Sequence, residues 1–107
     1  MSRKKSQISQ FNDQLGREGV VLVDFNLTGS VPCNSQLPII DGLSKQFIGK
    51  AAIRVLDIDK NRDLAEFLQI TSIPTLIILK NGKEVDRFVG LQSQKTLSIA
   101  IEKAIRY

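Results

Sequence analysis

The chain has 107 residues, of which 42% are hydrophobic and 24% charged, and 15 Lys and Arg against 11 Asp and Glu give a net charge of +4. This length predicts a single domain over residues 1–107 with one buried core. The composition excludes a disordered, collagenous or coiled-coil chain. One Cys excludes an intramolecular disulfide, and the absence of His excludes His-based metal sites and Ser–His–Asp or Cys–His catalysis.

Charge and hydropathy also limit the partners and the location. No apolar run approaches the roughly 20 residues that span a bilayer, and no apolar signal segment follows the basic start at residues 1–5. We therefore expect a cytoplasmic protein that does not bind membranes. The basic residues are scattered and aromatic residues make up 6%, so no nucleic-acid-binding surface is indicated.

The first quarter of the chain predicts a short helix and a buried strand. Residues 2–7 are polar and basic, and we expect them to be mobile. Apolar residues then recur at the spacing of one helix face, at Ile8, Phe11 and Leu15. The apolar run at residues 20–25 predicts a central strand that is buried on both faces and parallel to a neighbour.

A second helix and a second strand follow a loop over residues 26–32. Apolar residues of this helix recur at Leu37, Ile40, Leu43 and Phe47. Pro38 lies inside the pattern and predicts a kink. Residues 52–58 predict the second strand, which completes a right-handed βαβ unit.

The second half of the chain predicts a short helix, a β-hairpin and a final helix. Asn61 can cap the short helix, and Asn81-Gly82 predicts a type I′ turn between strands over residues 75–79 and 84–89. Ser93 can cap the final helix. The apolar face of this helix comprises Leu97, Ala100, Ile101, Ala104 and Ile105. The order indicates the α/β class, with a βαβ half joined to a ββα half.

The ordered set of motifs resembles the thioredoxin family from about Ile8 to Ile105. The motifs that carry the resemblance are Val21-Leu22-Val23-Asp24-Phe25, Pro32-Cys33, Pro38, Asp57-Ile58-Asp59, Ile73-Pro74-Thr75-Leu76, Lys80-Asn81-Gly82-Lys83 and Val89-Gly90. The resemblance implies a thioredoxin fold, with a central mixed β-sheet flanked by helices. It also implies a first strand near residues 2–7, where this polar sequence favours a short, frayed or missing strand.

The active loop departs from the family pattern Trp-Cys-Gly-Pro-Cys. The aligned residues are Gly29-Ser30-Val31-Pro32-Cys33. The resemblance therefore places Gly29 at the Trp, Ser30 at the nucleophilic Cys and Cys33 at the resolving Cys. Disulfide reduction by a dithiol needs a thiolate that attacks and a second thiol that resolves the mixed disulfide. We expect this activity to be absent or very weak.

Three residues of the site have alternative interpretations. Ser30 can cap a helix that begins at Val31 or Pro32. Cys33 is either an inert core residue or a thiol that forms mixed disulfides, which a low-molecular-weight thiol would have to resolve. Asp24 should have a raised pKa inside an apolar strand. The resemblance makes Asp24 the proton partner of Cys33, whereas the alternative is a vestigial residue.

Two further features concern the charge near Asp24 and the binding of a protein or peptide partner. The Lys that the family usually has near this Asp is Val55 here, which should raise the pKa of Asp24 further. Ile73-Pro74 matches the family's cis-proline, which implies a groove that pairs with an extended peptide. Gly29 and Gly90 would help to line this groove, and we include Val31 and Pro32 among the binding residues. The alternative for Ile73-Pro74 is a rigid turn.

Three hypotheses follow, and in the third the site is a remnant or modified active site with no remaining activity. In the first, the chain is a protein of cell redox homeostasis with monothiol chemistry at Cys33, assisted by Asp24. In the second, it is a non-catalytic or chaperone-like module that binds a protein or peptide in the groove at Ile73-Pro74. Whether the chain is an enzyme stays open. We expect a monomer without a cofactor or a metal. The alternatives at Cys33 are an intermolecular disulfide, which burial of the sulfur would disfavour, and a metal or iron–sulfur ligand shared between two chains, since one Cys supplies at most one ligand per chain.

Overall fold

The computed structural model describes residues 19–107, so the predicted helix at residues 8–15 and the segment at residues 2–7 lie outside the described part of the chain. The elements are β1 (Val20–Asn26), α2 (Val31–Gln46), β2 (Ala51–Asp57), a 3-10 turn η1 (Ile58–Lys60), α3 (Arg62–Phe67), β3 (Thr75–Lys80), β4 (Lys83–Val89) and α4 (Gln94–Arg106). The predicted α/β order, a βαβ half followed by a ββα half, is confirmed over these residues.

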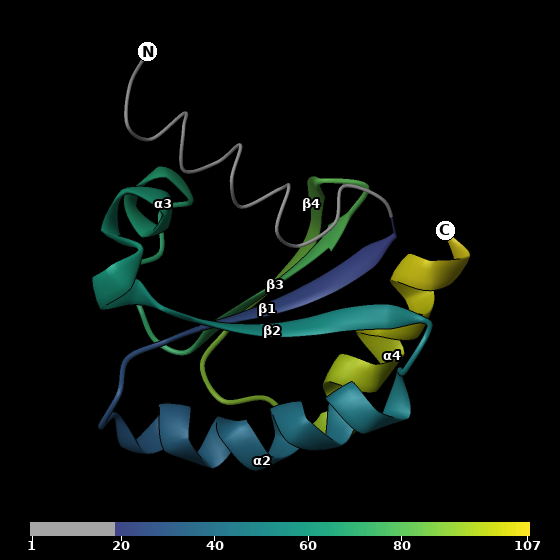
Figure 1. Cartoon of the computed structure of the whole chain (residues 1–107), viewed down its shortest axis with the longest axis horizontal. Coiled ribbons are helices and arrows are strands. Elements are labelled where there is room, and N and C mark those ends of the chain that lie inside the picture. Colours follow the sequence, from purple (N-terminus) through teal and green to yellow (C-terminus); the bar gives the residue numbers. More distant parts are fainter. Residues whose placement is uncertain (1–18) are drawn as a thin grey trace.

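The described strands form one mixed sheet in the order β2-β1-β3-β4. β1 pairs with β2 in parallel and with β3 in antiparallel, and β3 pairs with β4 in antiparallel. All seven residues of β1 are buried, which confirms the predicted central strand with a parallel neighbour. α2 and α4 cover one face of the sheet, whereas α3 lies at the other (Figure 1).

Alternate residues of β1 enter two apolar clusters. Val20 and Leu22 pack with residues of α2 and α4, while Val21, Val23 and Phe25 pack on the opposite face with Leu64 of α3. This alternation follows from the period of two in a β-strand. It also places Asp24, which shares the face of Val20 and Leu22, under α2.

The buried stripe of α2 differs from the predicted one. The helix begins at Val31, as the resemblance implied, and continues through Pro38. Its buried residues are Cys33, Gln36, Ile40 and Leu43, and Phe47 follows at the C-cap. The prediction that Leu37 belongs to this stripe was wrong, because Leu37 is 39% exposed and Gln36 is 0% exposed. Steps of three and four residues from Cys33 to Phe47 pass through position 36 and leave position 37 about 100° away.

The predicted hairpin turn and one predicted helix cap are confirmed, whereas a second predicted cap is wrong. Positive φ angles of 53° at Asn81 and 83° at Gly82 agree with the predicted type I′ turn. Ser93 caps α4, since its Oγ accepts a hydrogen bond from the backbone N–H of Thr96 at 3.1 Å. The cap predicted at Asn61 was wrong, because its Nδ2 instead donates to the carbonyl oxygen of Asp57 at 2.9 Å.

The second strand ends one residue earlier than predicted. Asp57 Oδ1 accepts a hydrogen bond from the backbone N–H of Asp59 at 2.8 Å. This bond starts the 3-10 turn at Ile58 and so ends β2.

Within residues 19–107, no helix has both the length and the apolar character that crossing a bilayer requires.

Candidate functional site

Three loops meet at one end of the sheet. Phe25, near the end of β1, pairs with Thr75 at the start of β3, and Thr75 pairs with Val89 at the end of β4. The segments beyond these residues therefore leave the sheet at the same end. We call residues 27–32, 71–74 and 89–93 the loop face.

The first loop places Ser30 at the start of α2. Its backbone N–H donates to the carbonyl oxygen of Leu27 at 3.1 Å, and its own carbonyl oxygen accepts from the N–H of Asn34 at 2.9 Å. Ser30 is the N-cap residue, but its hydroxyl makes no capping hydrogen bond, so the predicted side-chain cap was wrong. Pro32 lies in the first turn, where its missing N–H breaks no helical bond. Val31 is 75% exposed.

Cys33 lies inside the protein rather than on the loop face. Its side chain is 1% exposed, and its Sγ accepts a hydrogen bond from the backbone N–H of Leu27 at 3.5 Å. The burial agrees with the deep position that the resemblance implied for this sulfur. A disulfide in another protein can therefore reach this thiol only after α2 or the loop before it moves.

Asp24 is a buried acid without a partner among residues 19–107. It is 0% exposed, and neither carboxylate oxygen has a hydrogen bond there. Burial raises the pKa of the Asp24 carboxyl from 3.8 to about 6, in the predicted direction. Its register partners in the sheet are Val55 and Leu76, so neither neighbouring strand supplies a counter-charge at this level.

The second and third loops are joined through Pro74. The peptide bond between Ile73 and Pro74 is cis. Pro74 is buried, and its carbonyl oxygen accepts a hydrogen bond from the N–H of Gly90 at 2.8 Å. Ile73 remains half-buried. Gly29 is exposed in the loop before α2, with a φ of 92°.

Gln36 is a residue of this region that was not predicted from the sequence. Its Nε2 donates to the carbonyl oxygen of Gln92 at 3.0 Å, and its Oε1 accepts from the N–H of Gln92 at 2.8 Å. These bonds attach α2 to the third loop. In the sequence, Gln36 lies three positions after Cys33 and four before Ile40, which is the spacing of residues on one buried helix face. This spacing was the signal that Gln36 is buried.

Comparisons with known proteins now identify the family. The family model described as Thioredoxin matches residues 2–103. The chain belongs to the thioredoxin family. It is 42% identical over 95 residues to a thioredoxin of Staphylococcus saprophyticus, a match that covers 89% of this chain and 90% of that protein. It is 40% identical over 91 residues to a thioredoxin of Staphylococcus aureus, covering 85% and 88% respectively. The structure of a mutant thioredoxin from Halobacterium salinarum NRC-1 matches with a TM-score of 0.83 and 31% identity, covering 91% of this chain and 84% of that one.

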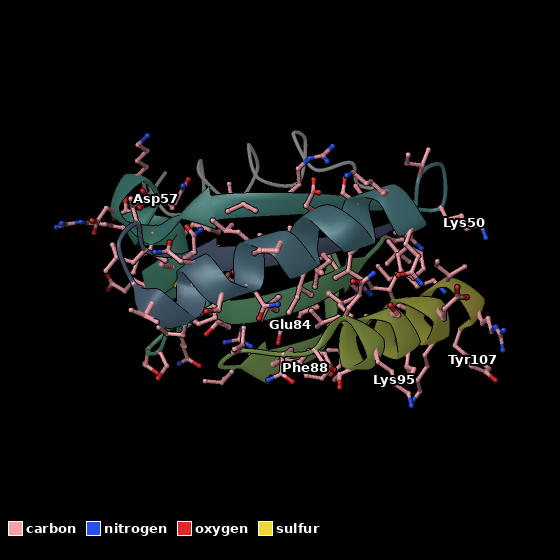
Figure 2. All side chains as sticks on the ribbon, turned by 90° about the horizontal axis from the view of Figure 1, so that it is seen from below. Lys50, Asp57, Glu84, Phe88, Lys95 and Tyr107 are labelled. Carbon is pink, nitrogen blue, oxygen red and sulfur yellow. The ribbon has the colours of Figure 1, made fainter. Side chains whose placement is uncertain are left out.

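In this thioredoxin-family redox protein, the loop face is uncharged and exposes several apolar side chains. None of residues 27–32, 71–74 and 89–93 is Lys, Arg, Asp or Glu. Three apolar side chains are exposed there, with exposed fractions of 75% for Val31, 60% for Val89 and 49% for Leu91. Asp57 flanks the face, and Thr28 Oγ1 donates to its Oδ2 at 3.4 Å. Figure 2 shows Asp57 at the end of the molecule where α2 begins, opposite Lys50.

The described part of this thioredoxin-family chain offers little to a metal ion. Over residues 19–107, no three Cys, Asp or Glu side chains come together as potential ligands. Cys33 is a free, buried thiol. The chemistry that the site can perform therefore depends on one thiol, one buried carboxyl and the backbone of the loop face.

Proposed function

We propose that this thioredoxin-family protein binds extended, uncharged protein segments on the loop face and does not catalyse dithiol disulfide reduction. The observation that carries the proposal is the contrast between the two parts of the site. Cys33, the chain's one thiol, is 1% exposed, whereas Val31, Val89 and Leu91 present apolar surface to solvent. These three side chains lie on loops that meet at one end of the sheet, and apolar side chains gathered on one surface are typical of sites that bind proteins.

The sequence of the first loop supports the loss of the dithiol cycle. Ser30 stands where the family has its attacking Cys, and a serine hydroxyl cannot form a mixed disulfide. With one Cys in the chain, no internal thiol can resolve a mixed disulfide formed at Cys33. A lone thiol of this kind stays reduced in the cytoplasm, which we propose as the compartment.

The charge of the loop face defines the partner. A face without charged residues favours an apolar segment over an acidic or basic one, since a charged segment would lose water without gaining an ion pair. The affinity should therefore change little when the salt concentration rises from about 0.05 to about 0.5 M, a range over which the attraction between exposed charges weakens strongly.

Binding of short synthetic peptides tests this function directly. The wild type should bind apolar peptides and ignore acidic or basic ones of the same length. Val89→Asp should abolish this binding, because it places a charge on the loop face. Val85→Asp is the matched control: Val85 is 51% exposed on the same strand but lies outside the loop face. Equal loss of binding in both variants, with the fold intact, would refute the proposal.

Insulin reduction with dithiothreitol as electron donor tests the missing dithiol cycle. The wild type should not accelerate the reaction. Ser30→Cys would supply the attacking thiol and leave Cys33 to resolve the mixed disulfide. Acceleration by Ser30→Cys alone would show that the rest of the site still supports the chemistry. Acceleration by the wild type would contradict the proposal.

Slow monothiol exchange at Cys33 is the second candidate function, and the buried carboxyl of Asp24 favours it. Burial raises the pKa of Asp24 to about 6, so near neutral pH its carboxylate can accept a proton from a thiol on the α2-facing side of the sheet. The alkylation rate of Cys33 in the native and the unfolded protein decides this question. A native rate close to the unfolded rate supports exchange, whereas a thiol that reacts only after unfolding excludes it.

A further inference from the structure

The buried side chain of Gln36 forms a two-point connection between α2 and the loop face. It is 0% exposed, donates to the carbonyl oxygen of Gln92 at 3.0 Å and accepts from the N–H of Gln92 at 2.8 Å. A glutamine amide has an NH₂ donor at one end and a carbonyl acceptor at the other, so the two bonds fix its orientation. The side-chain amide of Gln36 therefore makes the same pair of hydrogen bonds with the backbone of Gln92 that a neighbouring peptide group would make.

Other hydrogen bonds extend this connection across the third loop. The N–H of Gly90 donates to Pro74 at 2.8 Å. The side chain Nε2 of Gln92 donates to the carbonyl oxygens of Gly90 at 3.3 Å and Val89 at 3.4 Å. A continuous series of bonds therefore runs from Pro74 through residues 89–92 to Gln36 on α2.

An apolar residue would be the ordinary choice at position 36, between Cys33 and Ile40 in the buried stripe. Burying an amide is unfavourable unless its polar groups are satisfied, and here the backbone of Gln92 satisfies both of its ends. The amide thereby holds a loop that no strand pairing holds, because β4 ends at Val89 and α4 begins at Gln94.

We propose that Gln36 is a positioning residue of the loop face. It fixes the conformation of residues 89–92, which carry the exposed side chains of Val89 and Leu91, and so determines how tightly the face binds an extended apolar peptide. This inference rests on the proposed function, because it names the residue that shapes that binding surface.

Gln36→Leu removes both hydrogen bonds and keeps a side chain of similar size. We expect exchange of the Gln92 amide hydrogen to accelerate about tenfold, the effect of one lost hydrogen bond. Affinity for an apolar peptide that the wild type binds should fall by a similar factor. Amide exchange in β1 should not change, whereas a general loss of stability would accelerate it too.

Gln46→Leu is the matched control. Gln46 also lies on α2, and its Oε1 accepts hydrogen bonds from Gln94 Nε2 at 3.2 Å and from Ser98 Oγ at 3.0 Å. Gln46 therefore connects α2 to α4, at a place outside the loop face. Gln46→Leu should leave both the Gln92 exchange rate and the peptide affinity unchanged.

Gln36→Glu provides a rescue that a role in packing alone would not produce. A protonated carboxyl can donate to one atom and accept from another, as the amide does, whereas an ionised carboxyl can only accept. The affinity of Gln36→Glu relative to the wild type should therefore recover as the pH is lowered. Asp24 is a second buried acid on the same side of the sheet and would titrate together with a Glu at position 36, so both proteins are compared in the Asp24→Asn background.

The outcomes separate this inference from the proposed function. Faster Gln92 exchange together with weaker peptide binding in Gln36→Leu, but not in Gln46→Leu, supports the positioning role. Unchanged exchange overturns it, and so does faster exchange with unchanged affinity. A wild type that binds no apolar peptide overturns the proposed function, and with it the role of Gln36 in binding.

Discussion

Asp24 gives the sharpest prediction, because its burial ties the stability of the fold to pH. The pKa of its carboxyl is about 6 in the folded protein and 3.8 in the reference state that represents the unfolded chain. Below about pH 3 both states hold the proton, and the stability from keeping the neutral acid buried is fully present. As the pH rises, the unfolded chain releases its proton first, so this stability is lost between about pH 4 and pH 6.

The size of the loss follows from the two pKa values. One pKa unit corresponds to 1.36 kcal/mol, so the free energy of unfolding should fall by about 3 kcal/mol through this group. That is a large part of the roughly 5 to 15 kcal/mol that stabilises an ordinary domain. Asp24→Asn removes the titration and keeps the shape of the side chain.

Urea unfolding of the wild type and Asp24→Asn, from about pH 3 to about pH 8, measures this effect. The stability of the variant relative to the wild type should increase by about 3 kcal/mol over this range. The cost of burying an unpaired amide adds a constant offset and does not change the slope. Asp41→Asn, which removes a carboxylate that is 68% exposed, controls for the general change in net charge. Curves for Asp24→Asn and the wild type that stay parallel throughout would refute the argument.

Two other predictions concern local structure. Ser93→Ala should destabilise the protein by about 1 kcal/mol in urea unfolding, since its hydroxyl caps α4, whereas Ser30→Ala should have almost no effect, since its hydroxyl caps nothing. Equal losses in these two variants would contradict the assigned caps. Gly82→Ala should lower the free energy of unfolding by about 1 to 2 kcal/mol, because φ is 83° there and a Cβ is strained in that region; an unchanged unfolding midpoint would count against the turn geometry.

The sequence was sufficient to predict the sheet and most of its connections. The apolar run before Asn26 marks a strand buried on both faces, and Asn81-Gly82 has few conformations other than a tight hairpin turn. These signals are local, since each depends on a few adjacent residues.

The errors arose where the outcome depends on distant groups or on a rotamer. Ser30 and Asn61 both occupy N-cap positions, but the hydroxyl of Ser30 makes no capping bond and the amide of Asn61 turns back to the carbonyl of Asp57. The burial of Gln36 depends on Gln92, which lies 56 positions later in the chain. Neither residue alone shows that the other will satisfy its polar groups.

The central position of β1 has a consequence for the synthesis of the chain. β1 needs β2 on one edge and β3 on the other, and β3 begins only at Thr75. A ribosome that adds about 5 to 20 residues per second takes roughly 2 to 10 seconds to reach Thr75 after β1 is complete. During that time β1, whose seven residues are all buried in the folded sheet, has an unpaired edge, which is the kind of surface that joins other nascent chains. β1 is therefore open to such contacts until synthesis has passed β2 and reached β3.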